Sequence, residues 1–280
     1  MKTRVISAIV MIAFAAVIIY LGGIYFGATI FLVSIIGMYE FYKAFKSKGV
    51  KPVYILGYIY TLLIPVATFM NPSNALEIPV NGANIFPAVQ VIIMLVLLVL
   101  MVVAHKKVTP IDGAVTLLGA FYVPFLLSFF VLTRNMTDGL ALIIIGLLGS
   151  VAADTAAIFA GLLWGKKKLI PEISPKKTVA GSIGSFVGST IALIIYGLIL
   201  HYGGLMKDPV SVLHFAILGF IMGGTSQIGD LSASAMKRYC GIKDFGNLIP
   251  GHGGILDRFD SMLFNIPMVY CYIHILRALS

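Results

Sequence analysis

Long apolar runs separated by short polar connections dominate this sequence and restrict what it can fold into. Of its 280 residues, 59% are hydrophobic and only 11% are charged, and the mean hydropathy is +1.01. A soluble domain typically carries about 25% charged residues. The chain therefore has too little polar surface to face water, and the lipid bilayer is predicted to be its solvent.

Breaks at glycine, proline and charge clusters divide the apolar sequence into about nine segments, each close to the ~20 residues that a helix needs to cross a membrane. They run approximately 5–21, 24–44, 53–70, 85–104, 112–132, 139–163, 179–201, 211–236 and 259–278. These runs are too long for barrel strands and do not alternate in polarity. The predicted fold is an all-α integral membrane protein with about nine transmembrane helices.

The spans fall into two groups within one continuous membrane unit. Residues 1–135 hold about five spans, and residues 136–280 hold the remaining spans together with the longest polar connections, around 166–178 and 237–257. No internal repeat is visible. The polar chemistry is therefore expected in the second group.

The distribution of basic residues predicts the orientation of the chain. With nine spans, every Lys and Arg except Arg134, Lys207 and Arg277 lies on the same side of the membrane as the N-terminus. Cytoplasmic loops carry such an excess, so the N-terminus is predicted to be cytoplasmic and the C-terminus outside, in a multi-pass protein of the cell inner membrane. The same bias explains the net charge of +9 without nucleic-acid binding.

Two acidic residues stand inside apolar stretches, where a carboxylate is costly unless it is paired, hydrated or metal-bound. These are Asp154 and Asp230. Either could be a structural carboxylate hydrogen-bonded inside the bundle. Asp230 is the stronger functional candidate because Gln227, Ser234 and Lys237 share its helical face at spacings of three and four, with Arg238 beside them.

A glycine-rich loop follows this helix. Gly253 and Gly254 could let the backbone approach a phosphate, and His252 between glycines is either structural or a donor to phosphate oxygen. Asp257 and Asp260, three residues apart, are expected to face the same way at the start of the last helix. Carboxylates beside a phosphate site suit Mg²⁺, which prefers oxygen ligands.

A second polar connection contains Ser174, Lys176, Lys177 and Thr178. Two lysines beside hydroxyl groups and a helix N-terminus form a plausible anion site. The charge count places this connection on the same membrane face as the glycine-rich loop.

Together these residues resemble the signature of the phosphatidate cytidylyltransferase (CDP-diacylglycerol synthase) family. The matching positions are Ser234, Lys237, Arg238, Lys243, Asp244, Pro250, His252, Gly253, Gly254, Asp257, Arg258 and Asp260. The segments 227–231, 154–155 and 174–178 also look like bacterial members. One departure is Val179-Ala180-Gly181, where those members often have Trp-Glu-Gly.

The resemblance implies a homodimeric, all-helical membrane enzyme that uses CTP and phosphatidate to make CDP-diacylglycerol and pyrophosphate. It implies dependence on Mg²⁺ held by Asp230 and Asp257, with K⁺ nearby. The expected catalytic residues are Asp230, Lys237, Arg238, Asp257, Arg258 and Asp260. The expected substrate-binding residues are Asp154, Ser174, Lys176, Lys177, Thr178, Ser234, Lys243, His252, Gly253 and Gly254.

Three other functions remain open. A secondary transporter or ion channel would also place acids inside the membrane, although the polar groups here concentrate at one face. A CDP-alcohol phosphatidyltransferase would need a block of spaced aspartates that this chain lacks. A purely structural membrane protein would not need the glycine-rich loop with its acids and bases.

Overall fold

The computed structural model describes residues 2–70, 79–80, 83–249 and 251–279, and it divides the chain into two compact units. Unit 1 comprises Met1–Met136 and Cys240–Arg258, and unit 2 comprises Thr137–Tyr239 and Phe259–Ser280. The segment that follows the predicted Asp230 helix therefore packs with the N-terminal half of the chain. That the two groups of spans form one continuous membrane unit stays a prediction.

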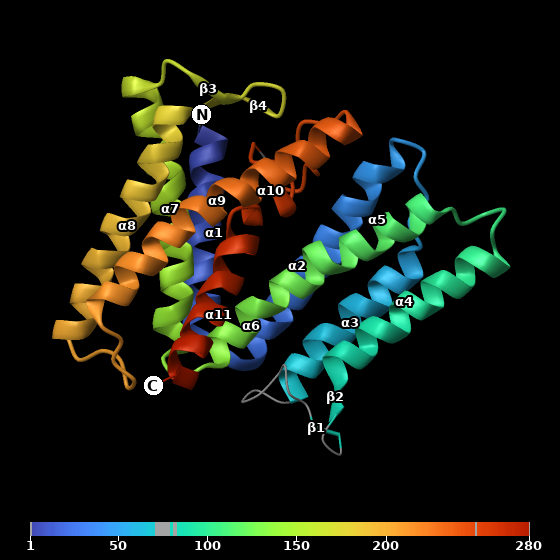
Figure 1. Ribbon diagram of the computed structural model, residues 1–280, viewed down its shortest axis with the longest axis horizontal. Coiled ribbons are helices and arrows are strands. Elements are labelled where there is room, and N and C mark those ends of the chain that lie inside the picture. The colour runs from blue at the N-terminus through green and yellow to red at the C-terminus, as the bar shows by residue number, and fades with distance from the viewer. Residues whose placement is uncertain (1, 71–78, 81–82, 250, 280) are drawn as a thin grey trace. The chain divides into compact units, whose positions relative to one another are not determined.

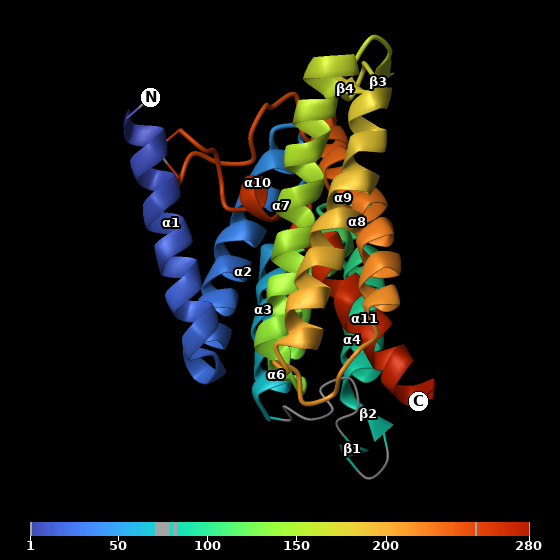
Figure 2. The ribbon, with the colours of Figure 1, turned by 90° about the vertical axis from the view of Figure 1, so that its left-hand side faces the viewer.

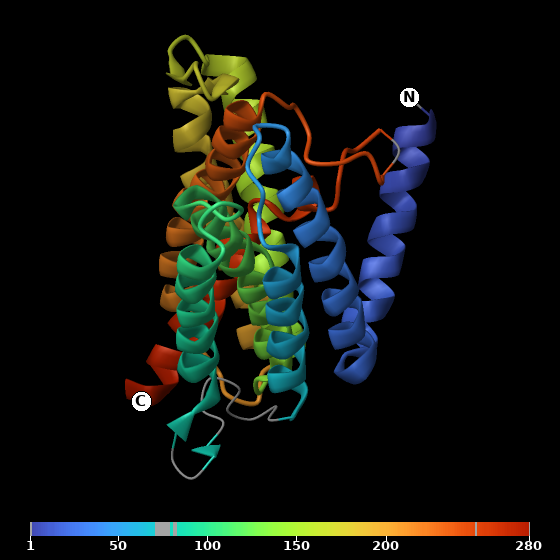
Figure 3. The same cartoon turned by 90° about the vertical axis from the view of Figure 1, so that its right-hand side faces the viewer.

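Unit 1 is built from helices that follow one another along the chain (Figure 1). They are α1 (Lys2–Leu21), α2 (Gly23–Lys46), α3 (Tyr54–Met70), α4 (Ile85–Val103), α5 (Pro110–Ala120), the π-helix η1 (Phe121–Phe125) and α6 (Leu126–Asn135). A two-stranded antiparallel ribbon, β1 (Pro79–Val80) and β2 (Ala83–Asn84), precedes α4. Figure 3 shows α1 and α2 as an antiparallel pair joined at one end.

Local sequence explains where the continuous helical segment α5–η1–α6 begins and where it changes from α-helix to π-helix. It begins with a capping box, in which Thr109 and Asp112 each accept a hydrogen bond from the other's backbone N–H. It continues through Pro124, which has no N–H to donate to the helical ladder, and the helix widens there into the π-turn η1. Asp112 also accepts a bond from Lys51 N at 2.6 Å, which fixes the connection between α2 and α3.

Unit 2 contains three long helices, α7 (Gly139–Trp164), α8 (Val179–Tyr202) and α9 (Val212–Cys240), followed by α11 (Met262–Leu279). A hairpin of β3 (Lys168–Ile170) and β4 (Ser174–Thr178) joins α7 to α8. Figure 2 shows α7 and α8 side by side with this hairpin at one end. The short helix α10 (Leu256–Phe259) crosses the division between the units.

Small residues bring the helices of unit 2 close together, as is common where lipid removes the hydrophobic driving force between helices. A side chain at Gly184 or Gly188 of α8 would overlap Ala160 or Ala156 of α7. Between α8 and α9, Ser189 Oγ donates to Gly219 O at 2.7 Å. The first contacts hold α8 against α7, and the hydrogen bond holds α9 against α8.

Helices occupy the predicted apolar segments, and the chain is a multi-pass membrane protein. Among the described residues, 6 helices are long and apolar enough to cross a membrane. Nine crossings, and the sides on which the termini lie, stay predictions. At about 1.5 Å per residue the 29 residues of α9 span roughly 43 Å, longer than a hydrocarbon core of about 30 Å.

The structure corrects two expectations. The connection at 174–178 is not a simple loop, since β4 pairs with β3, so the fold is nearly rather than wholly all-α. Asp257 and Asp260 also do not start one last helix: Asp257 lies in α10, Asp260 lies in the turn after it, and α11 begins only at Met262. Whether their side chains face the same way stays a prediction, because they belong to different units.

Candidate functional site

The predicted acid of α9 meets a predicted lysine of the hairpin. Lys177 Nζ lies 2.7 Å from Asp230 Oδ2, and both side chains are partly exposed. Ser234 Oγ, one turn along α9, donates to Asp230 Oδ1 at 3.4 Å. Asp230 and Ser234 therefore share a face of α9, as their spacing predicts, and the Asp230 carboxylate accommodates a cation.

Two further predicted acids of unit 2 lie near this pair. Asp154 accepts hydrogen bonds from Ser226 Oγ and Ser261 Oγ, both at 3.1 Å. Burial, followed by the nearby charge of Asp230, raises the pKa of Asp260 to about 7. This part of unit 2 therefore gathers three carboxyl groups, whose charged forms an additional cation would stabilise.

The rest of the hairpin has mixed roles. Thr178 is buried and caps α8, because its hydroxyl accepts a bond from Gly181 N at 3.1 Å. Arg238 Nε donates to Ile173 O at 3.3 Å, which ties the end of α9 to the hairpin turn. Lys176 is exposed and Ser174 is partly buried. A structural role thus accounts for Thr178, while the two lysines remain candidates for binding an anion.

In unit 1, Asp257 is buried and organises the glycine-rich loop. Its Oδ2 accepts hydrogen bonds from Phe245 N at 2.8 Å and from Gly254 N at 3.0 Å. These donors come from the two ends of the loop, so the carboxylate closes it. Asp257 is therefore a structural residue of the loop whatever else it binds.

Two glycines of the loop adopt backbone conformations that favour glycine. Gly251 and Gly253 have φ values of 77° and 85°, which residues with a side chain rarely adopt. The turn they form is closed by a hydrogen bond from Ile249 N to Gly253 O at 2.9 Å. Pro250, part of the family signature, lies outside the described residues. The expected approach of a phosphate to Gly253 and Gly254 stays a prediction.

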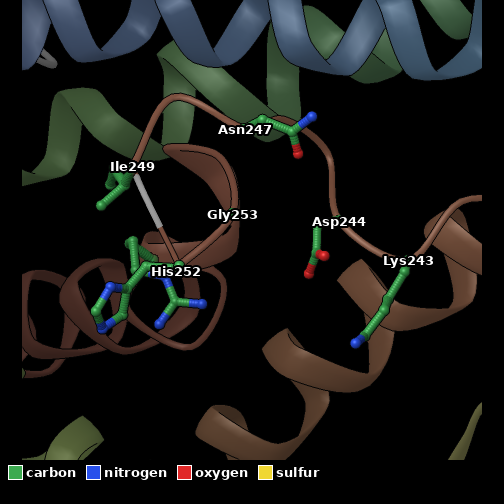
Figure 4. A pocket seen from close by; sticks show the side chains of 8 residues that line it. Lys243, Asp244, Asn247, Ile249, His252 and Gly253 are labelled. Carbon is green, nitrogen blue, oxygen red and sulfur yellow. The ribbon is translucent and has the colours of Figure 1, made fainter. Parts of the chain in front are cut away.

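The loop surrounds an open polar cavity of about 620 Å³, within the roughly 300–1,000 Å³ of small-molecule sites. Its lining consists of Lys243, Asp244, Asn247, Ile249, Gly251, His252, Gly253 and Arg258. Figure 4 shows Lys243 and Asp244 on one side of this space and Ile249 and His252 on the other. Two cations and a histidine against one acid favour an anionic ligand.

His252 has an unexplained buried atom. Its Nδ1 has no hydrogen-bond partner among the residues that the structure describes. A buried polar atom without a partner is unfavourable, so this ring is suited to a partner that arrives with a ligand. The observation favours the donor role over the structural role that the sequence left open.

The predicted metal ligands fall in different units, Asp230 in unit 2 and Asp257 in unit 1. Within the described ranges, no three His, Cys, Asp or Glu side chains lie close enough to hold one metal ion. Carboxylate oxygens are nevertheless the donors that Mg²⁺ prefers, and Asp230 already holds the ammonium group of Lys177. The donor chemistry fits, while the shared metal site stays a prediction.

Sequence reasoning missed one residue of the loop, Glu40 of α2. Its Oε1 accepts a bond from Ile255 N and its Oε2 from Leu256 N, both at 3.0 Å. An acid inside the apolar segment 24–44 was a signal of the same kind as Asp154 and Asp230. The partner of Glu40, 215 residues away, was not predictable from spacing.

Comparison with known proteins identifies the family. A profile described as "Cytidylyltransferase family" matches residues 2–276. A phosphatidate cytidylyltransferase of Synechocystis sp. is 33% identical over 98% of this chain and 96% of its own length. Those of Bacillus subtilis and Staphylococcus haemolyticus are each 30% identical over 96% of this chain, and over 96% and 97% of their own lengths. Because the profile and these relatives cover almost the whole sequence, the chain belongs to the cytidylyltransferase family.

Proposed function

We propose that this chain is a phosphatidate cytidylyltransferase, which converts CTP and phosphatidate to CDP-diacylglycerol and pyrophosphate. The observation that carries the proposal is the near full-length similarity to relatives of that name. The cavity in the glycine-rich loop and the Lys177–Asp230 pair agree with it, because the reaction brings two anionic substrates together.

In the proposed reaction, a phosphate oxygen of phosphatidate attacks the α-phosphorus of CTP. The bond from that phosphorus to the β-phosphate oxygen breaks, and pyrophosphate leaves with the bonding electrons. A phosphate monoester is already largely ionised near pH 7, so no strong general base is required. The task of the protein is to position the substrates and to offset their mutual repulsion.

The basic residues have distinct places in this proposal. Lys243, His252 and Arg258 line the cavity of unit 1 and would contact the triphosphate. Lys177 and Lys176 of the hairpin, with Lys237 and Arg238 at the end of α9, would offset charge on the reacting phosphates. Lys237 is buried, which strengthens any electrostatic interaction it makes.

Asp230 and Asp257 would hold Mg²⁺, with Asp260 and Asp154 adding negative charge near Asp230. Bound there, Mg²⁺ would neutralise triphosphate oxygens and the charge that develops on the leaving pyrophosphate. A K⁺ ion belongs to the same proposal, on the strength of the family resemblance alone.

The membrane location has a physical reason in this account. The acyl chains of phosphatidate stay in the bilayer, whereas CTP arrives from water. We therefore place the site at the cytoplasmic boundary of the inner membrane, in agreement with the basic bias of the loops. A homodimer is part of the proposal through the family resemblance.

The proposal is tested with purified protein in detergent, supplied with phosphatidate, Mg²⁺ and CTP labelled at the α-phosphate. Label should enter the lipid phase only when both substrates are present, and pyrophosphate should appear in equal amount. Asp208→Asn is a suitable control, since Asp208 is exposed, pairs with Arg277, and lies in the connection between α8 and α9. A folded protein that incorporates no label with any phosphatidate, with K⁺ present, would refute the proposal.

A further inference from the structure

Glu40 is a carboxylate buried within an apolar helix. Its side chain is only 4% exposed, and it lies in α2, a helix long and apolar enough to cross a membrane. Burying a carboxylate is unfavourable unless it is well hydrogen-bonded. Its presence there requires a reason, and nothing in the proposed chemistry supplies one.

The two oxygens of Glu40 bind two consecutive backbone amides. Oε1 accepts from Ile255 N and Oε2 from Leu256 N, each at 3.0 Å. These amides belong to the last residue before α10 and the first residue within it. One carboxylate of α2 therefore fixes the point at which the glycine-rich loop enters α10.

Two other residues of α2, close to Glu40 along the helix, contact the same loop. At Gly37, one turn earlier, a Cβ would lie 3.1 Å from Leu256 Cδ2. The ring of Phe41 stacks with Phe245 at a centroid distance of 6.4 Å. Phe245 and Leu256, near the two ends of the loop, thus pack against α2.

Two glycines of the loop leave space for this carboxylate. A Cβ built on Gly246 or on Gly254 would overlap the side-chain oxygens of Glu40. Gly254 is one of the signature glycines, and its φ is not in the left-handed region. Its lack of a side chain is therefore explained by Glu40, rather than by backbone conformation.

The bonds of Glu40 are coupled to those of Asp257. Asp257 accepts from Phe245 N and Gly254 N, and Glu40 accepts from the next two amides along the chain. Four amides of one loop are thus held by two buried acids. A shift of the loop at Ile255 would displace the Asp257 carboxylate together with the cavity lining.

We infer that Glu40 is a positioning residue for the reaction: its carboxylate fixes the glycine-rich loop so that Asp257 and Arg258 are held in working geometry. Glu40 touches no substrate in this account and transfers no proton. The inference rests on the proposed function for its kinetic consequence, whereas the anchoring of the loop is independent of it.

The substitution Glu40→Gln separates the hydrogen bonds that the carboxylate accepts from the space that the side chain fills. Glutamine has nearly the same shape, but only its oxygen accepts a hydrogen bond. Its amide N–H₂ would face one of the two backbone donors, and that donor would lose its partner. The loop should then shift or loosen while α2 keeps its packing, and a misplacement on the order of 1 Å can cost roughly 100-fold in rate.

Ser34→Ala is the matched control. Ser34 is buried in the same helix, and the hydrogen bond that its hydroxyl donates, to Ile30 O at 2.8 Å, stays within α2. Both variants and the parent are compared by hydrogen exchange with mass spectrometry, by thermal unfolding in detergent, and by kcat and KM per folded molecule. Exchange reports on the loop even if the protein turns over no CTP.

We expect Glu40→Gln to accelerate exchange in peptides covering residues 241–258, and to lower kcat at least about tenfold while both KM values change little. Ser34→Ala should match the parent in both readouts. Unchanged loop exchange in Glu40→Gln overturns the anchoring, and accelerated exchange with unchanged kcat overturns the catalytic consequence.

If Glu40→Gln does not fold, Gly246→Ala replaces it, because the added methyl group crowds the Glu40 carboxylate from the loop side, and its exchange and kcat are judged by the same criteria. A parent without cytidylyltransferase activity refutes the proposed function, and the exchange result then decides the anchoring alone.

Discussion

Replacing Asp257 in two ways separates its structural role from its chemical role. Its Oδ2 accepts bonds from Phe245 N and Gly254 N inside a buried part of the loop. Asp257→Ala leaves both donors without this acceptor, at about 1–3 kcal/mol each, so roughly 2–6 kcal/mol in all. Asp257→Asn can turn its amide oxygen toward both donors, and then loses only the difference between charged and neutral acceptors, about 1–2 kcal/mol.

Activity should not follow this order of stability. Both variants lose the negative charge that the proposed metal site requires, so both should lose at least about 100-fold in turnover, or roughly 2.7 kcal/mol. The assay combines denaturant or thermal unfolding in detergent with turnover per folded molecule. The reasoning fails if Asp257→Ala is as stable as Asp257→Asn, or if the Asn variant keeps more than about a tenth of the parental turnover.

Three further changes test other parts of the account. Lys177→Met should reduce turnover by about 100-fold, because it removes the cationic partner of Asp230. Lys207→Met, in the connection between α8 and α9, should leave turnover unchanged. Equal losses of turnover in the two variants would show that Lys177 does not belong to the site. Thr178→Ala should lower the free energy of unfolding by about 1 kcal/mol through loss of the α8 cap, with turnover per folded molecule falling less than about tenfold; a larger kinetic loss would give this hydroxyl a role in substrate binding. The pKa of Asp260 is raised from 3.8 to about 7. Between those two values the unfolded chain ionises before the folded one, so the parent should lose stability as the pH rises. Asp260→Asn, measured without divalent cations, should therefore become more stable relative to the parent from about pH 4 to about pH 7. A stability difference that does not change with pH would contradict that assignment.

Much of the architecture could be predicted because it depends on local hydropathy. Apolar runs of the length of a membrane helix form helices wherever the structure describes them, and the spacing of Asp230 and Ser234 correctly placed them on one face of α9. The substrate-binding role predicted for Lys177 stays a prediction, and its ion pair with Asp230 was not predicted from the sequence. Periodicity fixes which residues share a face, but not what lies opposite that face.

Features that depend on distant parts of the chain were missed. Glu40 reads as one acid in an apolar run, and its role appears only when residues 255 and 256 lie against α2. The β3–β4 hairpin was missed because strands of three and five residues give too little alternation to detect. No proline or glycine marks the break between α10 and α11 in the sequence, so the last helix was predicted to start too early.

The most direct test of the central claim follows two labels of CTP through one reaction with phosphatidate and Mg²⁺. The account predicts that phosphorus from the α-position enters the lipid, while phosphorus from the γ-position leaves entirely as pyrophosphate in equal amount. Label from the γ-position in the lipid would show phosphoryl transfer instead, and no label in the lipid from a folded protein would show that this chain does not join CTP to phosphatidate.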